Sequence, residues 1–242
     1  MIAVARLTKL YGQLKAVDEL SFTVAPGEIV GLIGPNGAGK TSTLRCIAGI
    51  HRPSAGTISV CGHDIVTAAV DAKRQLAFIA DEPQLFDYLS VNEHLQLMAR
   101  IYRVADAANS SRRLIEELEL VDKVDALPAE LSRGMKQKVA IACGLLHDPS
   151  ALVLDEPLTG LDPGGIRNMR ATIVARAARG AAVVISSHLL HLVEEVCTRI
   201  VIIHRGAKVA DGTLAELAAQ AHAAGAGSTL EQIFMAATAR ES

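Results

Sequence analysis

The sequence has few aromatic residues and almost no net charge. Phe, Tyr and Trp make up 3% of its 242 residues, Trp is absent, and 24 Lys and Arg against 26 Asp and Glu leave a formal net charge of −2. Proteins that hold duplex nucleic acid usually need a positive surface, and those that hold a single strand usually stack bases on aromatic rings. We therefore expect no nucleic-acid partner.

The sequence also lacks the patterns of a metal-binding, secreted or membrane-spanning chain. Its four cysteines form no CxxC pair, which favours small buried hydrophobic residues in a reducing cytosol over a zinc site or a disulfide framework. The N-terminal segment is too short and too polar for a signal peptide. No apolar run approaches the roughly 18 residues of a spanning helix. We expect a chain that touches a membrane only through a partner.

Hydrophobic residues make up 50% of the sequence, which is ample for a large core. Short β-branched segments predict strands at 2–7, 16–24, 28–33, 56–62, 76–80, 151–154, 182–185 and 199–204, and a turn with a short strand at 206–212. Helices are predicted after Gly39, because 42–48 contains no helix breaker, from Asp162-Pro163 onward and at 189–196. Alternation of strands and helices predicts an α/β fold with a mostly parallel sheet.

Between these parts the hydrophobic pattern becomes helical. Leu95, Met98, Ala99 and Tyr102 recur at helical spacing, Leu114, Leu118 and Val121 repeat the pattern, and a further helix is expected at 132–146. We expect one domain over 1–242: a core at 1–84 and 151–212, a helical insert at 85–150, and a C-terminal tail at 213–242. The tail is expected to hold a helix, a loop at 225–228 and an amphipathic segment at 230–237.

One segment matches the phosphate-binding motif G-x-x-x-x-G-K-[ST] in full. It follows the strand at 28–33, opens a helix, and consists of Gly34, Pro35, Asn36, Gly37, Ala38, Gly39, Lys40 and Thr41, with Ser42 next. Its glycines let backbone N–H groups turn toward phosphate oxygens, and the helix N-terminus adds partial positive charge. Lys40 is expected to reach the β- and γ-phosphates, and the Thr41 hydroxyl to bind Mg²⁺.

Two further segments carry polar residues suited to triphosphate chemistry. The apolar strand at 151–154 ends in Asp155, placed to approach Mg²⁺, and Glu156, placed to polarise a water for attack on the γ-phosphate. His188 follows the strand at 182–185 and could contact the γ-phosphate or the attacking water. Each segment alone is also compatible with an ordinary polar strand end. Together with a complete phosphate motif, they predict an ATPase that uses ATP and Mg²⁺.

These ordered motifs resemble the nucleotide-binding subunit of ATP-binding cassette (ABC) transporters from Tyr11 to about 212. The resemblance implies a P-loop NTPase core with an antiparallel β subdomain near the N-terminus and an inserted α-helical subdomain. It also implies that Tyr11 stacks on adenine beside Val17. Glu156 resembles the catalytic glutamate of the family, and His188 its switch histidine.

The resemblance also implies a second ATP-binding subunit, either an identical copy or a paralogue. Leu131-Ser132-Arg133-Gly134-Met135 is similar to the signature sequence L-S-G-G-Q, whose serine grips the γ-phosphate of ATP on the opposite subunit. Ser132 and Gly134 match this pattern. Asp162, in Thr159-Gly160-Leu161-Asp162, resembles the aspartate that couples the two sites.

The sequence departs from the family pattern at two places. Arg133 and Met135 replace Gly and Gln of the signature, and Arg133 is expected either to add charge toward phosphate or, the favoured alternative, to point to solvent. Asp81 stands where the family usually has a Gln that touches Mg²⁺, and we expect Asp81 to face the cation instead.

The aromatic residues cluster beside this second departure. Phe78, Phe86, Tyr88 and Tyr102 lie close together in the chain, where the family receives short helices of a membrane subunit. Phe78 and Tyr102 fit the core of the insert equally well, whereas Phe86 and Tyr88 fall in an expected loop. We interpret this segment as a surface for a separate transmembrane permease.

The function predicted from the sequence is the ATP-hydrolysing subunit of a transporter at the cytoplasmic face of the cell membrane. The signature variant and the end of the chain at Ser242, without a C-terminal regulatory domain, favour export. The alternatives are an ABC ATPase acting on nucleic acid or ribosomes, and a catalytically weak regulatory cassette. The net charge argues against the first and the complete catalytic set against the second.

Overall fold

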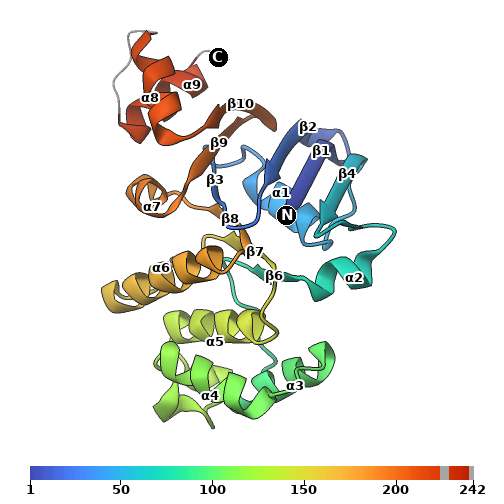
Figure 1. The fold of residues 1–242 in the computed structure, drawn as a ribbon, viewed down its shortest axis with the longest axis vertical. Helices are drawn as coiled ribbons and strands as arrows, with labels where there is room; N and C mark the ends of the chain where they lie inside the picture. The colour runs from blue at the N-terminus through green and yellow to red at the C-terminus, as the bar shows by residue number, and fades with distance from the viewer. Residues whose placement is uncertain (224–228, 240–242) are drawn as a thin grey trace.

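The computed structural model describes residues 1–223 and 229–239, and its centre is a six-stranded sheet (Figure 1). The strand order is β10-β9-β3-β8-β7-β6. All neighbouring strands are parallel except β9 and β10, which form an antiparallel edge pair. The strands are β3 (Ile29–Ile33), β6 (Leu76–Ile79), β7 (Ala151–Asp155), β8 (Ala182–Ser186), β9 (Arg199–His204) and β10 (Ala207–Gly212).

A second sheet is antiparallel throughout and has the strand order β2-β1-β4-β5. Its strands are β1 (Ile2–Tyr11), β2 (Leu14–Val24), β4 (Ala55–Val60) and β5 (His63–Asp64). Helix α1 (Lys40–Ile47) contributes Leu44 and Ile47 to a core shared by both sheets. The α/β fold with a mostly parallel sheet and an antiparallel β part is confirmed.

The strands β3, β7 and β8 are buried at every position, as their continuous apolar sequences predict. Since the neighbouring strands β3, β6, β7 and β8 are parallel, their carboxyl ends meet at one edge of the sheet. The segments that follow these four strands therefore converge, although they are far apart in the sequence. Open α/β sheets bind ligands at this edge.

Helices α3, α4 and α5 lie together at one end of the molecule (Figure 1). Ser90 and Glu93 form a capping box at the start of α3, which explains where that helix begins. Leu95, Leu114 and Val139 belong to their common core. The elements of this region are α3 (Val91–Tyr102), α4 (Ala107–Glu117), α5 (Arg133–Leu145) and the 3-10 turns η1 (Val121–Lys123) and η2 (Pro128–Glu130).

The helical pattern predicted through Val121 is wrong at its end. Helix α4 stops at Glu117, and Val121 belongs to a separate 3-10 turn. Glu119 between them has a φ of 57°, a left-handed conformation that cannot continue an α-helix. The short elements α2 (Ala69–Arg74) and β5 were not predicted from the sequence because they span too few residues to show a periodicity.

The remaining helices follow β7, β8 and β10: α6 (Pro163–Ala178), α7 (Leu190–Val196), α8 (Leu214–Ala223) and α9 (Leu230–Ala239). Asp162 caps α6, with Pro163 at its first position, as predicted. Helices α8 and α9 pack near β10, at the end of the molecule opposite α3–α5 (Figure 1). The loop expected at 225–228 lies outside the described residues. Within residues 1–223 and 229–239, no helix has the length and apolar character needed to span a bilayer.

Candidate nucleotide-binding site

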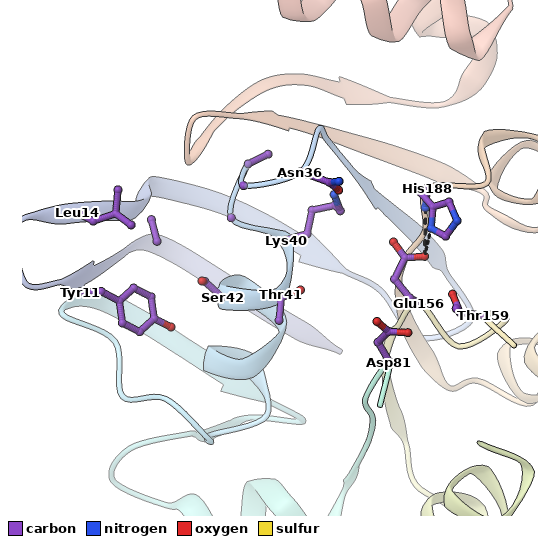
Figure 2. A pocket seen from close by; sticks show the side chains of 14 residues that line it. Tyr11, Leu14, Asn36, Lys40, Thr41, Ser42, Asp81, Glu156, Thr159 and His188 are labelled. Carbon is purple, nitrogen blue, oxygen red and sulfur yellow. Dashed lines mark hydrogen bonds and ion pairs between the residues drawn. The ribbon is translucent and has the colours of Figure 1, made fainter. Parts of the chain in front are cut away.

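A cavity of about 460 Å³ opens at the carboxyl edge of the parallel sheet (Figure 2). Tyr11 and Leu14 stand on one side, Asp81, Glu156 and His188 on the other, and Lys40 and Thr41 between them. Each sequence motif that we expected to contact nucleotide contributes to the lining, except the signature motif at the start of α5. The lining residues are Tyr11, Leu14, Ala16, Asn36, Gly37, Ala38, Gly39, Lys40, Thr41, Ser42, Asp81, Glu156, Thr159 and His188.

The phosphate motif forms the floor of this cavity. Gly39 has a φ of 103°, and a Cβ there would lie 2.3 Å from the carbonyl oxygen of Ala16, so only glycine fits. Helix α1 begins at the next residue, and no side chain caps it. The first N–H groups of a helix have no partner within the helix, and they carry its positive dipole end. This arrangement suits a phosphate group.

Lys40 is a partly desolvated cation next to two acids. Its Nζ donates to the carbonyl oxygens of Gly34, at 2.6 Å, and Pro35, at 3.1 Å. Burial lowers the pKa of Lys40, and the charges of Glu156 and Asp155 partly oppose that shift. Gly34 and Pro35 thus act on Lys40 through their carbonyls and do not line the cavity themselves.

The residues present fit a magnesium ion. The Thr41 hydroxyl lies 3.4 Å from Asp155 Oδ1, and the Ser186 hydroxyl donates to the same oxygen at 2.7 Å. Mg²⁺ prefers such oxygen donors and usually completes its shell with water and substrate phosphates. In the part of the chain that is described, no group of three or more His, Cys, Asp or Glu could hold a metal alone. An ion here would therefore depend on phosphate oxygens as well.

Glu156 and His188 form a hydrogen-bonded pair at the cavity wall (Figure 2). The His188 ring Nδ1 lies 2.8 Å from Glu156 Oε2, and the His188 backbone N–H donates to the same oxygen at 3.2 Å. Because an ionised carboxylate only accepts, the imidazole donates from Nδ1. Glu156 has a φ of 49°, a left-handed conformation that is uncommon for a residue other than glycine and is found at functional sites.

The signature residues lie outside the cavity of their own chain. The Ser132 hydroxyl caps α5 by accepting the Met135 N–H at 3.2 Å. A Cβ on Gly134 would lie 2.6 Å from the carbonyl oxygen of Gly160, so glycine permits the close approach of these two segments. Asp162 caps α6 by accepting the Gly165 N–H at 2.9 Å.

The two departures from the family pattern contact each other. Arg133 Nη2 lies 3.1 Å from Asp81 Oδ1. The expectation that Arg133 points to solvent agrees with its 54% exposure, but the side chain is also held by Asp81, an acid that lines the cavity. Two residues 52 positions apart in the sequence carry no local signal of such a pair.

The expected adenine side of the cavity differs in detail from the sequence analysis. Tyr11 is 41% exposed and packs edge-on against His51. Val17 is fully buried in the core and does not line the cavity, because its neighbour Ala16 and the exposed Leu14 occupy that wall. Leu14, Ala16 and Thr159 were missed. A leucine only three residues after Tyr11 is the one sequence signal that could have indicated Leu14.

A second, apolar groove of about 340 Å³ is lined by β6, the loop that follows it, α3 and α5. Phe78, Phe86 and Tyr102 line it, and Phe86 is 61% exposed. Tyr88 is 91% exposed and lies on the same loop. The expectation that Phe86 and Tyr88 are surface residues is therefore confirmed, whereas Tyr102 stacks on His147 with ring centroids 3.7 Å apart.

Comparison with known proteins gives the same result as this geometry. The family model described as "ABC transporter" matches residues 17–159, which is more than half of the chain. This chain belongs to the ABC transporter family. It is an ATPase of that family, and it binds nucleotide.

Individual relatives match most of the chain. It is 40% identical over 206 residues to the Nod factor export ATP-binding protein I of Burkholderia lata, covering 84% of this chain and 68% of that protein. The ABC-type transporter ATP-binding protein EcsA of Bacillus subtilis is 36% identical over 222 residues, covering 91% and 90%. A solved ATP-binding subunit of an ABC transporter superposes with a TM-score of 0.90 at 34% identity, covering 98% and 99%.

Proposed function

We propose that this ATPase powers export of a substrate through a separate transmembrane permease. The observation that carries the proposal is the convergence of Lys40, Thr41, Asp155, Glu156 and His188 around one cavity. The name of the 40% identical relative, a Nod factor export protein, supports the direction. The substrate itself is chosen by the permease, since the residues described here provide only the nucleotide chemistry.

Within the cavity, each residue would have a distinct role. Lys40 and the N-terminus of α1 would hold the phosphates, with Asn36 to Ser42 around them. Tyr11 and Leu14 would hold the adenine, because their apolar surfaces face the cavity at its far side (Figure 2). Val17 would support this wall from the core.

Thr41 and Asp155 would hold Mg²⁺, with Asp81 facing it. When bound, this ion would neutralise charge on the β- and γ-phosphates. Glu156 would take a proton from the attacking water as general base. His188, held by Glu156 through Nδ1, would direct its other ring nitrogen to the γ-phosphate or to that water.

A second ATP-binding subunit, either an identical copy or a paralogue, would complete the site. Ser132 and Gly134 lie at the N-terminus of α5 and do not line the cavity of their own chain. Their helix end suits phosphate as α1 does. In a head-to-tail pair, Ser132 and Gly134 would contact the partner's ATP, and Asp162 would lie at the junction of the two sites.

The groove beside the helical insert would receive the permease. Its exposed Phe86 and the neighbouring Tyr88 are large aromatic residues of the kind that are enriched in protein interfaces. The chain would then sit at the cytoplasmic face of the membrane. In such a complex, residues 1–84 and 151–212 would form the nucleotide-binding core, residues 85–150 the helical insert that contacts the permease, and residues 213–242 a C-terminal tail.

The Glu156→Gln variant tests the catalytic part of this proposal. The amide cannot accept the proton, so we expect ATP hydrolysis to fall by about 10²- to 10⁴-fold while ATP binding persists. ATP should then trap an assembled pair of subunits, visible by size-exclusion chromatography.

Glu82→Gln makes the same chemical change at an exposed residue outside the cavity and should keep the wild-type rate. A Glu156→Gln protein that hydrolyses ATP at full speed would remove Glu156 from its role. ATP hydrolysis without any pair of subunits would contradict the two-subunit site.

A further inference from the structure

The Arg133 side chain bridges three segments that are distant in the sequence. It starts at the first residue of α5 and runs along Gly160, where an added Cβ would lie 3.3 Å from its Cγ and Cδ. Its guanidinium then pairs with Asp81 at 3.1 Å. The side chain thus connects the N-terminus of α5 to an acid of the nucleotide cavity in the same chain.

A second residue of α5 holds the same loop. Gln137 lies one helical turn after Arg133, on the same face of the helix, and is 1% exposed. Its Nε2 donates to the carbonyl oxygen of Ala80 at 3.2 Å. Two side chains of α5 therefore hold two consecutive residues, Ala80 and Asp81, at the end of β6.

Charge explains why Arg133 and Asp81 need each other. A cation in the first turn of a helix is unfavourable, because that end of the helix dipole is positive. An acid at Asp81 adds negative charge to a cavity that already contains Glu156. The ion pair relieves both problems, and the other α5 ion pair, from Lys138 to Glu119 at 2.8 Å, does not lead to the cavity.

We propose that Arg133 is a positioning residue that acts through Asp81 and makes the N-terminus of α5 respond to ATP in its own chain. With no metal bound, the phosphates of ATP attract Arg133 and repel Asp81, so they loosen the pair and free the helix end that carries Ser132. The inference rests on the proposed ATP site, and it assigns a joint role to two residues that each depart from the family pattern.

Hydrogen exchange of the full-length protein tests this inference. The readout is the Met135 and Lys136 amides, which donate to the Ser132 hydroxyl and carbonyl. The probe is ATP in EDTA, which prevents turnover, at a dilution where size exclusion shows single copies. Because exposed ion pairs contribute up to about 1 kcal/mol, we expect ATP to speed exchange of these amides about two- to fivefold in the wild type.

Arg133→Ala, Asp81→Asn and the double variant should all exchange at the faster rate without ATP and show no further response to it. Arg133→Lys keeps the charge and should recover most of the response. Lys138→Ala breaks the other ion pair of the same helix and should leave the response to ATP intact. Calorimetry with ATP in EDTA shows whether each protein binds nucleotide.

Four outcomes separate the possibilities. A response to ATP that persists in Arg133→Ala overturns the inference, as does a wild type that binds ATP without responding. Effects of the two single variants that add up in the double variant also overturn it, because the residues would then act separately. A wild type that binds ATP neither in EDTA nor with Mg²⁺ overturns the proposed nucleotide site instead. Thermal unfolding confirms that each variant is folded.

Discussion

The nucleotide cavity and the apolar groove are two hollows of similar size with opposite chemistry. The cavity is lined by a lysine, a histidine, two acids and the glycines of the phosphate loop, and most of its charged groups lie in segments that the sequence alone singled out. The groove is lined by aliphatic and aromatic side chains drawn from residues between Ile50 and His147. Phosphate chemistry demands specific groups at fixed spacing, whereas an apolar surface can be assembled from many residue combinations.

The largest loss of activity should come from a substitution in the nucleotide cavity. Lys40→Met keeps much of the side-chain volume and removes the cation, so we expect ATP turnover to fall about 10²- to 10³-fold, as for other groups that stabilise transition-state charge. Steady-state ATPase assays check this. Lys15→Met, at an exposed residue paired with Asp18, is the control and should leave the rate unchanged. An active Lys40→Met protein would show that the lysine does not act on phosphate.

The next largest effect should come from substitutions in the groove, which should impair transport without changing ATP hydrolysis in the cavity. Phe86→Ser with Tyr88→Ser removes two exposed aromatic anchors, and losing such anchors commonly weakens binding by about 2 kcal/mol or more. We expect loss of transport and of copurification with the permease, while the separate subunit keeps its ATPase rate within about twofold.

Ile101→Ser provides a matched control for this pair, since Ile101 is as exposed as Phe86 and lies outside the groove. It should leave copurification intact. If instead the Phe86 and Tyr88 changes abolish ATPase activity of the separate subunit, those residues support the fold and the two hollows are not independent.

The smallest effect concerns stability and is confined to the groove. Burial lowers the pKa of His147 to about 4, below the value near 6.5 of an exposed histidine. As pH falls from about 6.5 to 4, the unfolded chain therefore binds a proton before the folded chain does, and stability is lost in that window. We expect His147 to account for about 1–2 kcal/mol of this loss.

Urea unfolding at pH 7 and pH 4.5 measures this contribution. His147→Phe keeps an aromatic ring against Tyr102 and cannot titrate, so its unfolding free energy should fall less over the same pH interval. Equal losses in the variant and the wild type would show that His147 is already protonated without penalty in the folded protein.

The sequence predicted the cavity better than it predicted the details of its walls. Lys40, Thr41, Asp155, Glu156 and His188 were placed correctly relative to the strands, because each lies at or after the carboxyl end of an apolar strand of a parallel sheet. Val17 was expected beside the nucleotide but lies in the core. In an irregular strand, the sequence does not show which of two neighbours, here Ala16 and Val17, faces the cavity. Register shifts in the pairing of β1 and β2 provide that irregularity.

The Arg133 contact shows a different limit. Its sequence neighbourhood indicates the start of a helix near Ser132, and the structure confirms that start and shows Ser132 as the cap. The partner of its charge depends on how α5 packs against the end of β6, which involves Gln137 and Ala80 as well. Pairing across 52 residues is a property of that packing and not of local spacing.

By itself, the sequence determined the α/β class, the phosphate loop and the two acids at the carboxyl end of β7. These features depend on local spacing and composition, which act before any long-range contact forms. Tertiary structure alone decided which side chains line the cavity, the ion pair between Asp81 and Arg133, and the assembly of the groove. Those depend on segments that meet only when the parallel sheet brings its carboxyl ends together and α5 packs against it.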